Sequence, residues 1–154
     1  MLQKNKGQIK IMKFPMFVDI ENKNILVVGA GKIGCRRIKT LLMFGADITV
    51  ISESIADEEL IGRVRFLKRK FDKNDIDNYF FVIAATNDRR VNSEISNLCK
   101  EKNIPVSVAD SAEESTFYFP AICLNDNICI GIVSDGYHHK LVRETAKKIR
   151  GNLL

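Results

Sequence analysis

Six residues near position 30 constrain the fold of this chain more than any other segment. Residues 29–34 read Gly-Ala-Gly-Lys-Ile-Gly, follow the apolar run 25–28 and precede a stretch of helical periodicity. In this G-x-G-x-x-G spacing the first glycine allows a tight turn, the second lets backbone approach a pyrophosphate, and the third lets helix and strand pack closely. The helix N-terminus supplies amide donors. The segment predicts a dinucleotide site, and a glycine turn without a ligand is the alternative.

Short apolar runs alternate with stretches of helical spacing from residue 25 onward. The expected strands span 25–28, 48–51, 64–67, 80–85 and 104–109. The first expected helix carries Ile33, Ile38, Leu41 and Leu42 on one side and ends at Gly45; the second carries Val91, Ile95, Leu98 and Cys99 and ends at Asn103. Repeated strand-helix units predict an α/β fold, a mostly parallel sheet covered on both faces.

The pattern changes after residue 110. Two apolar runs, 121–124 and 128–133, flank the turn residues at 125–127, which predicts a β-hairpin. The last stretch reads as an amphipathic helix from Lys140 to Arg150, with Leu141, Val142, Ala146 and Ile149 on one side. We therefore divide the chain into a nucleotide-binding domain, residues 1–110, and a smaller segment, residues 111–154.

Composition narrows the classes of partner. The formal charge of +5 comes from 24 basic and 19 acidic residues that are interleaved, so we interpret it as a solvated surface and expect no nucleic-acid partner. No apolar run is long enough for a bilayer, and the first residues, with Lys4, Lys6 and Lys10, lack a signal peptide's apolar segment. We expect a cytoplasmic protein without a membrane partner. The four cysteines lack metal-ligand spacing, so we expect reduced thiols and no metal site.

An acidic segment follows the second expected strand. Glu53 lies about twenty residues after the glycine loop, where a carboxylate commonly binds the adenine-side ribose, although Ser52 occupies the more usual position. Residues 52–60 hold four carboxylates and no Arg or Lys, which favours NAD over NADP. Alternatively, the acids only favour a helix N-terminus. Ser54 and Asp57 form a plausible capping pair for a short helix.

Polar residues also follow the fourth and fifth expected strands. Because ligands of open α/β sheets lie beyond the carboxyl ends of strands, Thr86, Asn87 and Asp88 are candidates for the nicotinamide end of the site. Capping of the strand-to-helix turn explains Thr86 and Asn87 equally well. Asp110, at the end of strand five, either accepts a proton while hydride leaves the substrate or caps the next turn.

Taken together, these segments resemble one family, the precorrin-2 dehydrogenases and the N-terminal module of siroheme synthases. The likeness runs from Phe14 to Arg150, nearly the whole chain. Its marks are Phe14-Pro15-Met16-Phe17-Val18-Asp19, Val27-Val28-Gly29-Ala30-Gly31 leading to Arg36-Arg37, Ala84-Ala85-Thr86-Asn87-Asp88 followed by Val91-Asn92, Val106-Ser107-Val108-Ala109-Asp110, and Phe119-Pro120-Ala121. Each mark alone is weak, but in this order they are specific.

The resemblance implies a Rossmann-type doubly wound parallel sheet and a homodimer whose C-terminal segment, a hairpin plus a helix, forms much of the interface. It implies NAD at the glycine loop, a tetrapyrrole substrate in a cleft beside it, and NAD-dependent oxidation of precorrin-2 to sirohydrochlorin. Asp110 inherits the role of catalytic aspartate and general base. Taken with the motif, the expected cofactor contacts are Gly29, Gly31, Lys32, Ile33, Gly34, Glu53, Ser54, Thr86 and Asn87.

Two departures from the family bear on the substrate side. Where the family has a Gly, Lys, Ser, Pro-like turn, this chain reads Gly136-Tyr137-His138-His139-Lys140. The two histidines face the substrate, a metal or solvent, and we expect solvent. The sequence also stops at Leu154, so we expect oxidation rather than iron chelation. The alternatives are a sirohydrochlorin ferrochelatase and a non-catalytic NAD-sensing module.

Overall fold

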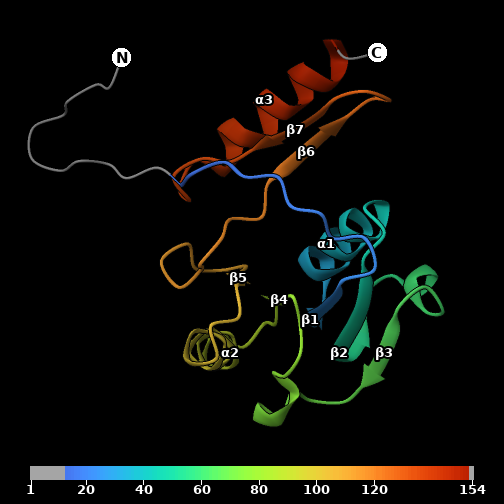
Figure 1. Ribbon diagram of the computed structural model, residues 1–154, viewed down its shortest axis with the longest axis vertical. Coiled ribbons are helices and arrows are strands. Elements are labelled where there is room, and N and C mark those ends of the chain that lie inside the picture. Colours follow the sequence, from blue (N-terminus) through green and yellow to red (C-terminus); the bar gives the residue numbers. More distant parts are fainter. Residues whose placement is uncertain (1–12, 153–154) are drawn as a thin grey trace, which may run out of the picture.

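Five parallel strands form the central sheet of this protein. The computed structural model describes residues 13–152, so Lys4, Lys6 and Lys10 lie outside the described residues. The strands are β1 (Asn24–Ala30), β2 (Asp47–Ile55), β3 (Arg65–Lys68), β4 (Phe81–Ala84) and β5 (Val106–Val108). Their order across the sheet is β3-β2-β1-β4-β5 (Figure 1). The α/β parallel fold predicted from the alternating pattern is confirmed.

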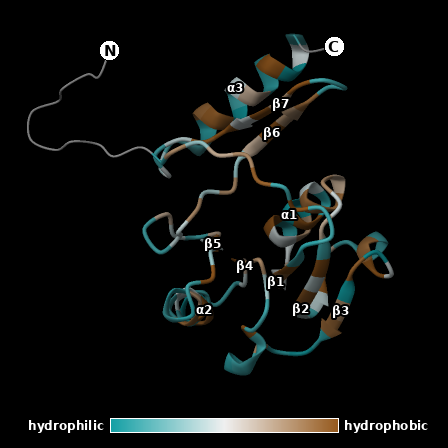
Figure 2. Cartoon of the chain, viewed as in Figure 1, coloured by the Kyte–Doolittle hydropathy of each residue, from teal (hydrophilic) through white to brown (hydrophobic). Residues whose placement is uncertain are grey.

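Two helices cover opposite faces of this sheet. Helix α1 (Lys32–Met43) packs with Ile25 and Val27 of β1, and α2 (Arg89–Glu101) packs with the alternate residues Leu26 and Val28. All four β1 side chains are at most 2% exposed, which explains why the run is apolar without alternation. Figure 2 shows hydrophobic residues along the strands and polar residues on the outer turns. Each face therefore has its own core.

The strand order places a switch point beside β1. The chain passes from β1 through α1 to β2 on one side, and after β3 it crosses to β4 on the other side of β1. The loops that follow β1 and β4 consequently lie on either side of the switch point at the carboxyl edge, which is where open α/β sheets bind their ligands. The glycine loop and the 86–88 turn flank this position.

The C-terminal segment is a separate small layer. Strands β6 (Ala121–Leu124) and β7 (Cys129–Ile132) form an antiparallel hairpin, and α3 (His139–Asn152) packs on it (Figure 1). Asn125 closes the turn by accepting hydrogen bonds from the amides of residues 127 and 128, at 3.0 and 2.9 Å. The predicted hairpin and helix are confirmed. No helix among residues 13–152 is both long and apolar enough to cross a membrane.

Three details of the predicted pattern are wrong. Ile33 is 45% exposed because it lies five positions before the buried Ile38 and so points away from that side of α1, whereas Cys35, three positions before Ile38, is buried. Leu141 is 61% exposed, since α3 faces the hairpin through Val142, Ala146 and Ile149. Strand β2 runs to Ile55, paired with Ala30 past a bulge, so Ser54 lies in the strand and caps nothing.

Candidate functional site

The glycine loop joins β1 to α1 at the switch point. Gly29 has φ +94°, and a Cβ there would lie 2.4 Å from the Ala85 carbonyl oxygen, so only glycine fits between β1 and β4. A Cβ on Gly34 would lie 2.1 Å from the Gly29 carbonyl oxygen, so this glycine permits the helix to pack on its own loop. A Cβ on Gly31 would meet no described heavy atom within 4 Å. Packing therefore explains two glycines, while the third faces open space.

The first turn of α1 points toward that open space. Gly31 is the N-cap residue, and no side chain of the described residues caps the helix. The Gly31 carbonyl accepts from the Cys35 amide at 2.9 Å, which leaves the amides of Lys32, Ile33 and Gly34 at the uncapped end. Free amides and the helix dipole favour an anion at this end. Lys32 and Ile33, both predicted contacts, are exposed here.

The end of β2 borders the same loop. The Ser52 hydroxyl accepts a hydrogen bond from the Ala30 amide at 3.2 Å and so fixes the loop's second residue. Glu53 and Ser54 follow as exposed residues of the strand. The predicted Ser54–Asp57 capping pair is wrong, because Asp57 alone caps the next turn by accepting from the Glu59 amide at 3.1 Å. Ser52 is therefore a structural part of the site, a role that an acidic ribose ligand after the second strand does not predict.

Asp57 also forms an ion pair with Lys39 of α1. The Lys39 ammonium holds the pKa of Asp57 below its usual value, and the Asp57 carboxylate raises the pKa of Lys39. Both side chains are solvent-accessible, so the pair contributes little to stability. Its effect on the site is that one of the four carboxylates of residues 52–60 is already neutralised.

The turn after β4 is closed by its own side chains. Thr86 donates its hydroxyl to Asn92 Oδ1 at 2.7 Å, and its amide donates to the same oxygen at 3.0 Å. Asn92 returns a bond from Nδ2 to the Thr86 carbonyl at 3.1 Å and is fully buried. Asp88 caps α2 by accepting from the Arg90 amide at 2.9 Å. Thr86 thus makes the contacts that the capping alternative predicts, and its cofactor contact, like that of Asn87, stays a prediction.

Asp110 follows β5 on a tightly fastened loop. The Ser115 hydroxyl accepts from the Val108 amide at 2.9 Å and donates to the Ser111 carbonyl at 2.8 Å. Thr116 accepts from the Val106 amide at 2.8 Å. These bonds satisfy the free edge of β5 and fold residues 111–116 back along it. The backbone at Asp110 is therefore held, while its carboxylate remains 40% exposed.

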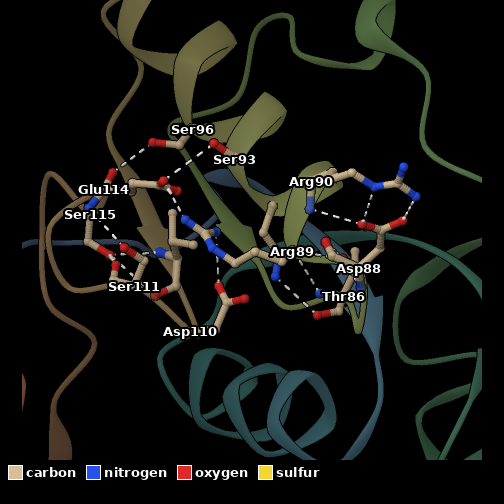
Figure 3. A network of polar contacts seen from close by, with 12 residues as sticks. Thr86, Asp88, Arg89, Arg90, Ser93, Ser96, Asp110, Ser111, Glu114 and Ser115 are labelled. Atoms are coloured by element: carbon tan, nitrogen blue, oxygen red, sulfur yellow. Dashed lines mark hydrogen bonds and ion pairs between the residues drawn. The ribbon is translucent and has the colours of Figure 1, made fainter.

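Arg89 links Asp110 to the neighbouring helix. From the first turn of α2, its Nη1 lies 3.4 Å from Asp110 Oδ1 and its Nη2 forms a close ion pair with Glu114 (Figure 3). Ser93 adds a bond to Glu114 Oε1 at 3.3 Å, and Ser96 donates to the Glu114 carbonyl at 2.7 Å. The Arg89 guanidinium holds the pKa of Glu114 below its usual value. Sequence reasoning missed both Arg89 and Glu114, because no motif joins positions 21 or more residues apart.

A cavity of about 410 Å³ separates the carboxyl end of β5 from the C-terminal hairpin and helix. Its lining includes charged, polar and aromatic side chains: Arg37, Ser107, Asp110, Glu113, Phe119, Tyr137 and His139. The Tyr137 hydroxyl donates to Glu113 at 3.1 Å. His138 points elsewhere, 2.7 Å from Asp135 and 59% exposed, whereas His139 borders the cavity. Among residues 13–152, no three His, Cys, Asp or Glu side chains are grouped for a metal ion.

The sequence and the fold match known proteins over most of the chain. A family model described as "Putative NAD(P)-binding" matches residues 16–121, more than half of the chain. A multifunctional siroheme biosynthesis protein of Ruminiclostridium josui is 45% identical over 143 residues, which cover 90% of this chain and 28% of that protein. A siroheme synthase of Vesicomyosocius okutanii is 34% identical over 143 residues, or 90% of this chain and 31% of that protein.

A solved structure agrees with these relatives. The precorrin-2 dehydrogenase SirC matches with a TM-score of 0.74 and 29% identity, covering 91% of this chain and 71% of that one. The chain thus spans 28–31% of the length of these curated sequence relatives and most of SirC. The family predicted by resemblance is confirmed, and the chain belongs to the NAD(P)-binding family of the siroheme synthases and precorrin-2 dehydrogenases.

Proposed function

We propose that this protein oxidises precorrin-2 to sirohydrochlorin with NAD as the acceptor. One observation carries the proposal: the uncapped N-terminus of α1, beside the open position at Gly31, lies at the same carboxyl edge of the sheet as the Asp110 carboxylate. The open position fits a pyrophosphate, because a close backbone approach is what a dinucleotide needs there. Bound at this loop, NAD supplies the acceptor for one hydride from the substrate.

The chain's own residues account for the remaining step. Oxidation removes a proton together with the hydride, and two carboxylates line the cavity, those of Asp110 and Glu113. Glu113 already accepts a hydrogen bond from Tyr137, so Asp110 is the candidate proton acceptor. Arg89 holds one of its oxygens and leaves the side chain 40% exposed, so the carboxylate can accept the proton and release it to water. Residues 111–116, fastened along β5, keep the carboxylate in a defined place. Positioning and proton acceptance are thus the contributions of this edge.

Anaerobic turnover tests the proposal. Precorrin-2 and NAD are mixed with the protein, and the absorbances of NADH and sirohydrochlorin are followed. We expect Asp110→Asn to keep its NAD affinity and to lose about 99% or more of the rate, since a general base contributes roughly 10²–10⁴-fold. Asp126→Asn, in the exposed hairpin turn, is the matched control. Formation of no NADH by a folded protein that binds NAD would reject the assignment and favour a sensing module.

We propose NAD rather than NADP as the preferred cofactor. Glu53 is exposed at the carboxyl end of β2, directly after the residue that fixes the glycine loop. A carboxylate there can accept bonds from ribose hydroxyls and repels a 2′-phosphate. We expect a Kd for NAD at least about tenfold below that for NADP. In Glu53→Arg the difference between these two Kd values should narrow or reverse. Glu59→Arg makes the same charge change nearby, so an equal effect of both variants would contradict a direct contact.

We also propose that two copies associate through the C-terminal segment. Four large apolar residues on or beside β6, β7 and α3 are exposed: Leu124 by 36%, Ile128 by 48%, Val133 by 37% and Leu141 by 61%. Such a concentration on one small layer supports an interface with a second copy. We expect Leu141→Lys to shift the sedimentation coefficient toward the monomer, whereas Met43→Lys, on α1 and 67% exposed, should not. A monomeric wild-type protein would contradict the proposal.

A further inference from the structure

Arg37 is a cation in the cavity wall that forms no ion pair with another residue of 13–152. It lies on α1, half-buried, and its guanidinium is 5.1 Å from the centre of the Phe119 ring. Its Nη1 donates a single long hydrogen bond, 3.4 Å, to the Ser107 hydroxyl. Among the ion pairs of residues 13–152, none involves Arg37. Most of its five N–H donors therefore lack a strong acceptor.

This arrangement is unfavourable for the protein alone. Burial, with a smaller effect of the neighbouring Arg36 charge, lowers the pKa of Arg37 to about 10. The side chain still carries its charge at neutral pH, because that pKa lies well above 7. A desolvated guanidinium that faces a neutral hydroxyl and an aromatic ring recovers only part of its hydration energy. An anionic ligand in the cavity would recover the rest.

The other charged groups of the cavity are distributed unevenly. Asp110 and Glu113 line it as carboxylates, the latter bonded to Tyr137, and Arg37 lies at the β5 and Phe119 side of the same space. A ligand with carboxylate side chains is repelled by the two acids and attracted by the guanidinium. The distribution of charge thus favours a ligand carboxylate at the Arg37 side of the cavity over one beside the two acids.

We propose that Arg37 binds a carboxylate side chain of the tetrapyrrole substrate and so sets which edge of the macrocycle approaches Asp110. The inference rests on the function proposed above. The planar fork of arginine suits a bidentate pair with a carboxylate, and the Arg37 guanidinium lies over the Phe119 ring. Arg37 is accordingly a substrate-binding residue, distinct from the proton acceptor.

Binding of sirohydrochlorin, the stable product, tests this role with the full chain. Absorbance titration gives its Kd for the wild type, Arg37→Met, Arg37→Lys and Arg36→Met. Loss of a charge-assisted pair of about 1.5–3 kcal/mol corresponds to a roughly 10–100-fold higher Kd for Arg37→Met. Arg37→Lys keeps the charge but not the fork, so we expect an intermediate Kd. Arg36→Met removes an exposed charge from the same helix, and its Kd should change less than about twofold.

Steady-state kinetics and NAD calorimetry separate the possible failures. We expect Arg37→Met to raise KM for precorrin-2 more than it lowers kcat and to leave the Kd for NAD unchanged. Equal Kd values for Arg37→Met and Arg36→Met, or no binding by the wild type, would overturn the inference. Binding that depends on Arg37 without NADH formation from precorrin-2 would instead overturn the proposed function alone. Met keeps an unbranched apolar stem like that of Arg but not the guanidinium, and Arg37→Lys serves if Arg37→Met does not fold.

Discussion

Two glycines of the same loop have different roles: Gly34 is needed for the packing of the fold, and Gly31 for the cofactor site. An alanine at position 34 would place its Cβ 2.1 Å from the Gly29 carbonyl oxygen, about 1.2 Å closer than an ordinary carbon–oxygen contact. Backbone on both sides must move, so we expect a loss of about 3 kcal/mol in the free energy of unfolding. An alanine at position 31 meets no described atom within 4 Å and costs only about 1 kcal/mol as a poorer N-cap.

For NAD affinity we expect the opposite order, with the larger loss in Gly31→Ala. A methyl group on residue 31 occupies the place where backbone and pyrophosphate approach, so we expect Gly31→Ala to weaken NAD binding by about 10–100-fold. Thermal unfolding measures the first effect, and for a chain of this size about 3 kcal/mol lowers Tm by roughly 6–12 °C. Calorimetry at a temperature where each variant is folded measures the second. A folded Gly31→Ala with the wild-type Kd, or a Gly34→Ala as stable as the wild type, would refute this assignment of roles.

Three further outcomes follow from the same contacts. Because Arg89 lowers the pKa of Glu114, the stability that this pair contributes is present above the unfolded pKa and is lost as pH falls through the folded pKa. Urea unfolding measured from pH 7 to 3 should therefore show that acid lowers the free energy of unfolding less in Glu114→Gln than in the wild type or in Glu94→Gln. Arg89→Met should lower kcat for oxidation, since Asp110 loses its one ion pair among the described residues, and an unchanged kcat would count against this positioning. Only Cys129 is not fully buried, so one of the four thiols should react rapidly with a thiol reagent, and rapid reaction in Cys129→Ser would be inconsistent with the fold.

The parts of the fold that follow from periodicity could be predicted from the sequence. The run 25–28 is buried on both faces, so it reads as a central parallel strand, and the spacing after it reads as a helix. The hairpin was predictable because Asn125 supplies turn chemistry that is local in the chain. Ile33 is apolar but lies five positions before Ile38, so the helical period places Cys35 and not Ile33 on the buried side.

Contacts between distant residues could not be predicted in this way. The Arg89–Glu114 pair joins a helix to a loop 25 positions away, and only the pairing of β4 with β5 brings the two together. Arg37 and Phe119 meet across an even longer separation. The positions of the strand ends in the sequence predict the correct edge of the sheet for the site. They do not show which polar side chains at that edge already form hydrogen bonds within the turns.

That distinction decides which polar residues at the carboxyl edge remain available to ligands. Thr86, Asp88 and Asn92 are polar residues at the same edge as Asp110, yet their hydrogen-bonding groups close the turn and start α2. Asp110 keeps an exposed carboxylate with one long contact, and Arg37 keeps a charge that no acidic side chain in the described part of the chain pairs with. A group whose partners lie within the fold stabilises the fold, whereas a charged group left with weak partners at a cavity gains most from a ligand. The carboxylate and the guanidinium are therefore where binding energy and chemistry should be sought, and the turn after β4 is where stability should be.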